Sequence, residues 1–262
     1  MQKTTPFVDR SQLQWGIIGA GQIARVFCNA IRFSARSSLR AIASRSYSPL
    51  SSLPKDFFHP SVDTYRDYHD LLADPKIDAV YIATINRDHA TCAIDAMKAG
   101  KHVLVEKPIA ITRSSLRSMI EVSQSSKVAL MEGFMYRFHP QLERVRAVIA
   151  DQQLGQILRI ESTFAYQEIA DPHHRVYQRH LGGGSLLDVG CYTVSISRLI
   201  AQWALGPHYG EPSISDAHGV IGESGVDLYA EATLLFPKGL TATLCSSISH
   251  NAPPLVKVIG SR

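Results

Sequence analysis

The chain has 262 residues, of which 45% are hydrophobic and 19% are charged, and its formal net charge is +4. This is the composition of an ordinary globular protein that is long enough for two domains. The charge is mild and no block of Lys or Arg stands out, which excludes the basic footprint of a nucleic-acid-binding protein. No stretch reaches the length of a transmembrane helix. We therefore expect neither a nucleic-acid partner nor a membrane partner.

The first segment, residues 1–13, is polar and lacks the apolar core of a signal peptide. We expect it to be a disordered leader ahead of the first strand. The four cysteines are far apart and form no C-x-x-C pair: Cys28, Cys92, Cys191 and Cys245. Such spacing favours reduced thiols inside a cell, so we expect a cytoplasmic protein.

A glycine-rich turn joins the first predicted strand to the first predicted helix. Residues 15–18 are apolar, as in a buried parallel strand, and an amphipathic helix follows. The G-x-G-x-x-A pattern between them lets the chain turn tightly, approach a pyrophosphate and pack the helix on the strand, and the first helical N–H groups then face the phosphates. The alternative is a tight turn that binds nothing. Five residues are candidates for cofactor binding here: Gly19, Gly21, Gln22, Ile23 and Ala24.

The second predicted strand, residues 39–44, ends in Ser44-Arg45-Ser46. At this position in dinucleotide-binding folds an acidic residue binds the ribose 2′-hydroxyl of NAD, whereas an Arg accommodates the 2′-phosphate of NADP. Two hydroxyls that flank a guanidinium suit a phosphate dianion. We therefore expect these three residues to bind NADP, with NAD as a weaker possibility. An ordinary solvated arginine in a loop is the alternative.

Prolines between residues 49 and 60 predict an irregular connection that continues to Tyr65, followed by a helix near residues 68–72. Residues 79–84 then predict another buried strand, followed by a loop and a helix. Loops at the carboxyl edge of such a sheet line the ligand crevice. Thr84, Asn86 and His89 are therefore candidates for contacting the cofactor, although His89 could instead simply occupy the start of its helix.

A fourth strand, residues 103–105, leads to Glu106-Lys107-Pro108. A charged pair directly after an apolar strand lies at the edge of the crevice, so Glu106 and Lys107 are further candidates for cofactor binding. Pro108 fixes the turn and is a candidate for a cis peptide bond.

An aromatic segment, residues 132–140, contains Arg137. It is either the end of a core strand or a wall for a nicotinamide, with Arg137 near the cofactor or the substrate. The neighbouring predictions are a helix over 114–125, a strand over 127–131 and a helix over 140–150.

Strands alternate with helices up to residue 150, which predicts an α/β domain with a Rossmann-type, doubly wound parallel sheet over residues 14–150. Longer strands then follow one another, which predicts an α+β domain with a mainly antiparallel open sheet over residues 151–262. Its expected strands cover 157–166, 213–221, 227–236 and 240–249, with a hairpin turn at residues 237–239.

A second glycine-rich passage, residues 182–192, lies inside this second domain and predicts a helix that continues to residue 199. Asp188 and Tyr192 are four residues apart, so they share one helical face. Nearby histidines show no recognisable ligand spacing, so we expect no metal site.

Four motifs together resemble the glucose–fructose oxidoreductase / inositol dehydrogenase (Gfo/Idh/MocA) family of pyridine-nucleotide enzymes. They are residues 19–24, 106–108, 136–140 and 182–192. Many members carry His at the position of Tyr192. A Tyr there is similar to the branch of dimeric trans-1,2-dihydrodiol dehydrogenases and NADP-dependent D-xylose dehydrogenases.

The resemblance implies that Lys107, Asp188 and Tyr192 are the catalytic group. It implies an NADP-dependent oxidoreductase that transfers a hydride between a secondary alcohol and the nicotinamide, the alcohol being a sugar such as D-xylose or a cyclic trans-diol. Tyr has a pKa of about 10 and is a poor base, but a neighbouring ammonium such as that of Lys107 favours the phenolate. Asp188 would orient the substrate or Lys107. The alternative is a salt bridge between Lys107 and Asp188, with Tyr192 packed in the core.

Members of this family usually continue beyond the point that matches residue 262, so we expect the second domain to be incomplete at its C-terminus. The open sheet mediates dimerisation in many members, which implies a homodimer if the domain is complete. The alternative function is a nucleotide-binding protein without turnover. A P-loop enzyme is excluded because G-x-x-x-x-G-K-[ST] does not occur.

Overall fold

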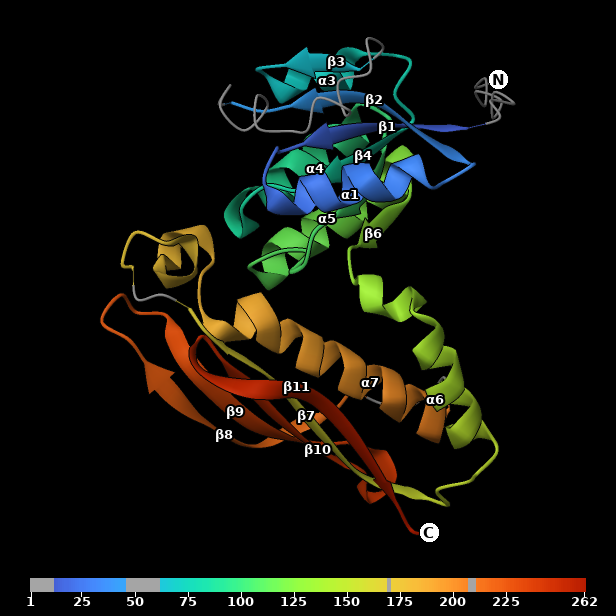
Figure 1. Ribbon diagram of the computed structural model, residues 1–262, viewed down its shortest axis with the longest axis vertical. Helices are drawn as coiled ribbons and strands as arrows, with labels where there is room; N and C mark the ends of the chain where they lie inside the picture. The colour runs from blue at the N-terminus through green and yellow to red at the C-terminus, as the bar shows by residue number, and fades with distance from the viewer. Residues whose placement is uncertain (1–11, 46–61, 169–170, 207–210) are drawn as a thin grey trace. The chain divides into compact units, whose positions relative to one another are not determined.

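The computed structural model describes residues 12–45, 62–168, 171–206 and 211–262 (Figure 1). The chain forms two compact units, Met1–Gly133 and Phe134–Arg262. The predicted leader lies outside the described residues apart from Gln12 and Leu13, and Leu13 already belongs to the first strand. The predicted irregular connection also lies largely outside them, at residues 46–61, but its last residues form a short strand, Asp63–Tyr65. Among the described helices, none has the length and apolar character to span a membrane.

The first unit contains a six-stranded sheet in the order β3-β2-β1-β4-β5-β6. Every neighbouring pair of strands is parallel, and the order reverses between β1 and β4, where such sheets bind ligands. The predicted doubly wound sheet is therefore confirmed. Its strands are β1 (Leu13–Ile18), β2 (Ser37–Ala43), β3 (Asp63–Tyr65), β4 (Ala79–Ile82), β5 (His102–Val105) and β6 (Leu130–Glu132).

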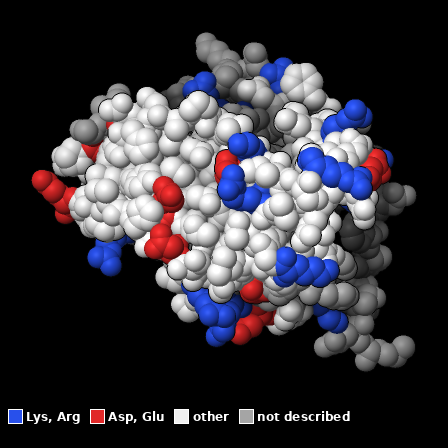
Figure 2. Space-filling model, turned by 90° about the horizontal axis from the view of Figure 1, so that it is seen from below, with Lys and Arg blue, Asp and Glu red and all other residues white. Residues whose placement is uncertain are grey.

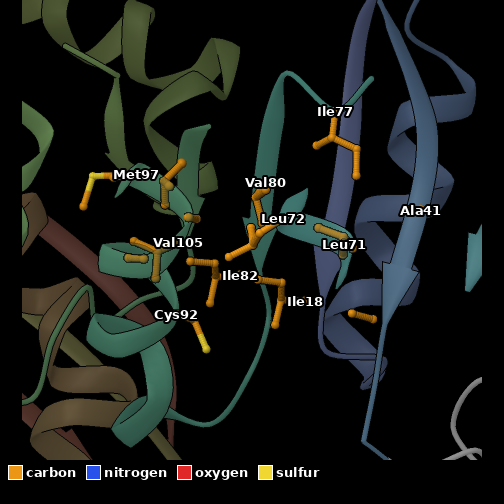
Figure 3. Close-up of a cluster of buried hydrophobic side chains, with 14 of the residues drawn as sticks. Ile18, Ala41, Leu71, Leu72, Ile77, Val80, Ile82, Cys92, Met97 and Val105 are labelled. Atoms are coloured by element: carbon orange, nitrogen blue, oxygen red, sulfur yellow. The ribbon is translucent and has the colours of Figure 1, made fainter. Parts of the chain in front are cut away.

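Helices cover both faces of this sheet. Successive strand residues point to opposite sides, so each strand contributes side chains to the core on both faces. Ile17 packs in the cluster beneath α1, whereas Ile18 belongs to the cluster on the other face, which Figure 3 shows with Val80 and Ile82. Both faces are apolar, so the strands read as continuous hydrophobic stretches. The helices are α1 (Gln22–Arg32), α3 (Tyr68–Ala73), α4 (His89–Lys98) and α5 (Arg113–Ser126).

The strand predicted over 127–131 begins later than expected, at Leu130 in β6. Lys127 adopts a left-handed conformation (φ 56°) and caps α5, so the extended backbone cannot start there. The three-residue strand β3 was not predicted, because a short polar segment at a sheet edge carries no hydrophobic pattern.

The second unit contains a five-stranded sheet in the order β11-β7-β10-β9-β8. Only the β7–β10 pair is parallel among the pairs described, so the predicted, mainly antiparallel sheet is confirmed. The turn at Pro237–Gly239 joins β9 to β10 as expected. The strands are β7 (Ile157–Gln167), β8 (Ser213–Ile221), β9 (Asp227–Leu235), β10 (Thr241–Ser247) and β11 (Ser249–Gly260).

Two helices, α6 (Pro140–Ala150) and α7 (Cys191–Leu205), accompany this sheet (Figure 1). Ile196 and Ile200 of α7 pack with Ile160, Leu244 and other strand residues in one buried cluster. Ile149 of α6 lies in the same cluster, which explains why the compact unit begins before α6, whereas the change of sequence pattern comes after it. The helix predicted to end at residue 199 continues to Leu205.

Candidate active site

The glycine turn after β1 requires Gly19 and leaves room beside Gly21. Gly19 has φ 102°, and a Cβ there would lie 2.4 Å from the Ala83 main-chain oxygen. A Cβ on Gly21 would meet nothing within 4 Å. Gly21 is the extended N-cap residue just before α1 and makes no side-chain cap on the helix, so the first helical N–H groups can bind an anion. Ala24 lies on the buried side of α1, whereas the predicted contacts Gln22 and Ile23, on the same helix, are exposed.

The tip of β2 places an arginine in solvent. The Ser44 N–H donates to the main-chain oxygen of Tyr65, 3.0 Å away, and the Arg45 side chain is 82% exposed. Its Nη2 lies 3.4 Å from Asp88 Oδ2, an exposed ion pair of little energetic weight that a phosphate could replace. Sequence reasoning did not identify Asp88. Ser46 lies outside the described residues.

The three predicted residues in and after the loop that follows β4 differ in burial. Thr84 is partly exposed, whereas Asn86, in the short helix η2 (Asn86–Asp88), is buried. His89 is the first residue of α4 and is 1% exposed. Its Nδ1 lies 2.8 Å from the main-chain oxygen of Pro108, and its Nε2 lies 3.2 Å from that of Thr84. Both ring nitrogens therefore face the protein main chain, which favours the reading in which His89 occupies the start of its helix.

The turn after β5 contains a cis peptide bond between Lys107 and Pro108, as predicted. The two carboxylate oxygens of Glu106 accept from the Tyr81 hydroxyl at 2.5 Å and from the Lys107 N–H at 3.2 Å. The Ile109 N–H donates to Glu132 Oε1 at 2.8 Å. These bonds hold the backbone on either side of Lys107 at the carboxyl edge of the parallel sheet.

In the second unit, Tyr192 lies among three aromatic rings near the start of α7. Its ring centroid is 5.3 Å from that of Phe134, 6.0 Å from that of Tyr136 and 5.4 Å from that of Phe164. The Tyr192 hydroxyl contacts Met135 Sδ at 3.5 Å. The predicted aromatic segment therefore packs against the proposed catalytic phenol, and Arg137 lies exposed on the same short helix, η3 (Met135–Phe138).

Asp188 is buried and its carboxylate is held from two sides. Its Oδ2 accepts from the Tyr166 hydroxyl at 2.6 Å, and its Oδ1 lies 3.2 Å and 3.3 Å from the two terminal nitrogens of Arg175. Burial and the neighbouring Asp188 charge raise the pKa of Tyr166, so this phenol remains a hydrogen-bond donor. Sequence reasoning missed Tyr166 and Arg175.

The predicted shared face of Asp188 and Tyr192 arises in an unexpected way. Asp188 belongs to a π-helical turn, η6 (Leu186–Gly190), and Tyr192 to the α-helix that follows it. Asp188 contacts Tyr166 and Tyr192 packs on Phe164, two residues earlier on β7. Alternate strand residues point the same way, so both side chains lie over one face of β7. A π-turn of this kind is frequent at functional sites.

Asp227, at the start of β9, fixes the glycine-rich passage before this turn. Its Oδ2 accepts from the Ser185 hydroxyl at 2.7 Å and from the Leu186 N–H at 2.6 Å. A Cβ on Gly184 would lie 2.2 Å from Asp227 Oδ1, so the close approach requires glycine. Within the described part of the chain, no cluster of three or more metal-ligating side chains occurs.

Both units match models of one enzyme family. The model described as an oxidoreductase family with an NAD-binding Rossmann fold matches residues 13–134, and the GFO/IDH/MocA C-terminal domain matches residues 142–262.

Two curated relatives and one solved structure illustrate the similarity. Trans-1,2-dihydrobenzene-1,2-diol dehydrogenase of Mus musculus is 31% identical over 254 residues, which cover 95% of this chain and 73% of the relative. D-xylose 1-dehydrogenase (NADP(+)) 2 of Haloferax volcanii is 34% identical over 237 residues, 90% of this chain and 69% of the relative. The 3-ketoreductase KijD10 of Actinomadura kijaniata, in complex with NADP and TDP-benzene, matches with a TM-score of 0.83 at 28% identity, over 95% of this chain and 74% of its own. As the four motifs predicted, the chain belongs to the GFO/IDH/MocA family of oxidoreductases.

Proposed function

We propose that this protein is an NADP-dependent dehydrogenase of secondary alcohols, with Tyr192 as the acid/base and Lys107 as its assisting cation. The substrate is a sugar such as D-xylose or a cyclic trans-diol. The observation that carries the proposal is the position of Tyr192, a partly buried phenol packed among aromatic rings over the same face of β7 as Asp188. Relatives named as dehydrogenases of a trans-diol and of D-xylose support the substrate class.

The turn after β1 fits a dinucleotide. A pyrophosphate would be held by the N–H groups at the start of α1, because the N-cap residue Gly21 has no side chain to cap them and the space beside it is open. When bound, the nicotinamide supplies the hydride acceptor for alcohol oxidation and the donor for the reverse reaction.

The chain itself handles the proton. As the alcohol carbon loses its hydride, the hydroxyl must lose a proton, and the phenolate oxygen of Tyr192 takes it; in the reverse direction the phenol returns it. A free phenol ionises at a pH of about 10, so the reaction near neutral pH needs a positive charge that stabilises the phenolate. We assign this role to the Lys107 ammonium.

In this proposal Asp188 does not exchange a proton with the substrate. It orients the substrate hydroxyl or Lys107. Its oxygens accept from Tyr166 and from both terminal nitrogens of Arg175, which fixes the orientation of the carboxylate that would position a substrate hydroxyl or Lys107. The Arg175 guanidinium balances the carboxylate charge, which would otherwise oppose formation of the phenolate nearby.

Arg45 supports NADP over NAD. Its exposed guanidinium follows β2, where a 2′-phosphate meets the fold, and its present partner, Asp88, is only loosely paired at 3.4 Å. A phosphate dianion would attract the guanidinium more strongly than a ribose hydroxyl would. The NADP named for the Haloferax relative and bound in the KijD10 structure agrees with this preference.

Two measurements on the wild-type chain test the proposal. The change in NADPH fluorescence on mixing measures cofactor binding, and NADPH formation followed by absorbance measures turnover with D-xylose and with a trans-dihydrodiol. We expect both binding and turnover. Binding without turnover over a broad panel of alcohols would overturn the dehydrogenase and favour a nucleotide-binding protein without activity.

We also propose that the protein forms a homodimer through the sheet of the second unit. Val220 on β8 and Leu255 on β11 are 55% and 59% exposed, and burying such side chains against a second copy is favourable. On the face shown in Figure 2, acidic and basic side chains lie in small mixed groups and not in one patch of single charge. Sedimentation velocity would show a dimer; a monomer at every concentration tested would contradict it.

A further inference from the structure

His89 bridges two loops that carry proposed site residues. It is 1% exposed, and its ring spans from the Pro108 oxygen, 2.8 Å from Nδ1, to the Thr84 oxygen, 3.2 Å from Nε2. Thr84 follows β4, and Pro108 follows β5 directly after Lys107. One buried side chain therefore ties together the ends of two neighbouring parallel strands.

Only one of the two contacts can be a conventional hydrogen bond when the imidazole is neutral, because a neutral ring carries one N–H. The shorter distance assigns that proton to Nδ1, which then donates to Pro108. Burial lowers the pKa of His89; the two carbonyl contacts and the charge of Glu106 oppose this effect, and the charge of Lys107 adds to it. The neutral ring is therefore the form that prevails near pH 7.

A hydrogen bond to the Pro108 carbonyl can fix the backbone next to Lys107 and so the position of the Lys107 side chain. The residues on either side are already fixed, Glu106 by the Tyr81 hydroxyl and Ile109 by Glu132. The bond from His89 holds the peptide between them, on the side of α4. Without it, the carbonyl would be left without its donor and the turn could shift.

We propose that His89 is a positioning residue for Lys107, acting through the Pro108 carbonyl without touching cofactor or substrate. The inference rests on the proposed role of Lys107 as the cation that assists Tyr192. A displacement of about 1 Å in a catalytic group can lower turnover by about a hundredfold, so the loss of a single buried hydrogen bond becomes measurable in kcat.

Three substitutions separate the two contacts of His89. His89→Asn keeps an N–H donor near the position of Nδ1, so it can still donate to the Pro108 oxygen. His89→Gln places its donor near the position of Nε2, so it can donate only to the Thr84 oxygen. His89→Phe keeps the ring volume but has no donor. With NADP and D-xylose or a trans-dihydrodiol, we expect kcat for His89→Asn within about threefold of wild type. For His89→Gln and His89→Phe we expect a fall of roughly tenfold to a hundredfold, with the KM for NADP changed by less than about threefold.

Cys92→Ala is the matched control, because Cys92 lies one turn further along α4 and is 5% exposed. It should lower stability without lowering kcat. Amide hydrogen exchange of residues 105–110 provides a readout that needs no substrate: exchange should accelerate in His89→Gln and His89→Phe but not in His89→Asn or Cys92→Ala. Wild-type kcat in His89→Phe, or equal exchange in His89→Asn and His89→Phe, would overturn the inference. If the wild type shows no turnover, the proposed function fails and the exchange experiment alone decides the role of His89.

Discussion

Replacing Arg175 by Met tests how much the ion pair between the Arg175 guanidinium and the buried Asp188 carboxylate stabilises the fold. The Asp188 side chain is 8% exposed and that of Arg175 is 45% exposed, with Oδ1 and Nη1 3.2 Å apart. Two unit charges about 4 Å apart attract by about 4 kcal/mol at an effective dielectric constant of 20. Because nearly half of the guanidinium faces water, solvent screening reduces this attraction. We therefore expect Arg175→Met to lower the free energy of unfolding by about 1–2 kcal/mol.

Thermal unfolding followed by circular dichroism measures this loss as a lower Tm, by about 2–8 °C. The matched control is Arg179→Met, since Arg179 lies in the neighbouring helix η5 (Arg179–Leu181) and forms no ion pair among the described residues. A double-mutant cycle with Asp188→Asn isolates the pairwise term. We expect Arg175→Met to cost at least about 1 kcal/mol less in the Asp188→Asn background.

The same substitution should affect turnover. Without Arg175 the Asp188 charge opposes formation of the Tyr192 phenolate, so the acid limb of the kcat/KM profile for alcohol oxidation should move to higher pH. The reasoning is refuted if Arg175→Met and Arg179→Met have the same Tm, or if the coupling energy with Asp188→Asn is below about 0.3–0.5 kcal/mol, the limit within which independent sites add.

The remaining predictions concern the proposed cofactor-binding residues of the first unit and two buried thiols. Arg45→Ala should weaken NADPH binding roughly tenfold to a hundredfold and NADH binding by less than about threefold in fluorescence titrations; equal losses would refute the 2′-phosphate assignment. Gly19→Ala should destabilise the fold, because φ is 102° and the added Cβ meets a main-chain oxygen at 2.4 Å, whereas Gly21→Ala should leave Tm unchanged and weaken NADPH binding; the reverse pattern would contradict the turn geometry. Burial raises the pKa of Cys28 to about 11 and that of Cys92 to about 12. The unfolded thiols ionise first, at about pH 8.5, so the free energy of unfolding should fall above that pH by up to about 1.4 kcal/mol per pH unit for each thiol; denaturant titrations that show no fall between pH 9 and 11 would contradict this.

The first sheet could be predicted from sequence because each buried parallel strand is a continuous apolar stretch between turns, as in residues 79–82. β11 escaped prediction because Pro253 and Pro254 argue against a strand, yet β11 lies at the sheet edge, where a proline need not donate to a neighbour. The glycine turn was predictable because its spacing is local.

The surroundings of Asp188 could not be predicted in the same way. Tyr166 is 22 residues away and Arg175 is 13 residues away, and only the packing of η6 on β7 brings them together. No spacing rule links a tyrosine on β7, an arginine in the short helix η4 (Arg175–Tyr177) and an aspartate in the π-helical turn η6. The burial of His89 also depends on tertiary structure, since its two carbonyl partners come from separate loops.

The most direct test of the account compares Tyr192→Phe with Tyr136→Phe in NADPH formation from the best alcohol substrate. Both tyrosines belong to the same aromatic cluster, but the Tyr136 hydroxyl is bonded to Ser195 at 2.8 Å and has no proposed chemical role. We predict that Tyr192→Phe lowers kcat by about a hundredfold to ten-thousandfold with NADPH affinity retained, and that Tyr136→Phe retains most of the activity. Equal kcat values for Tyr192→Phe and wild type would contradict the assignment of the acid/base.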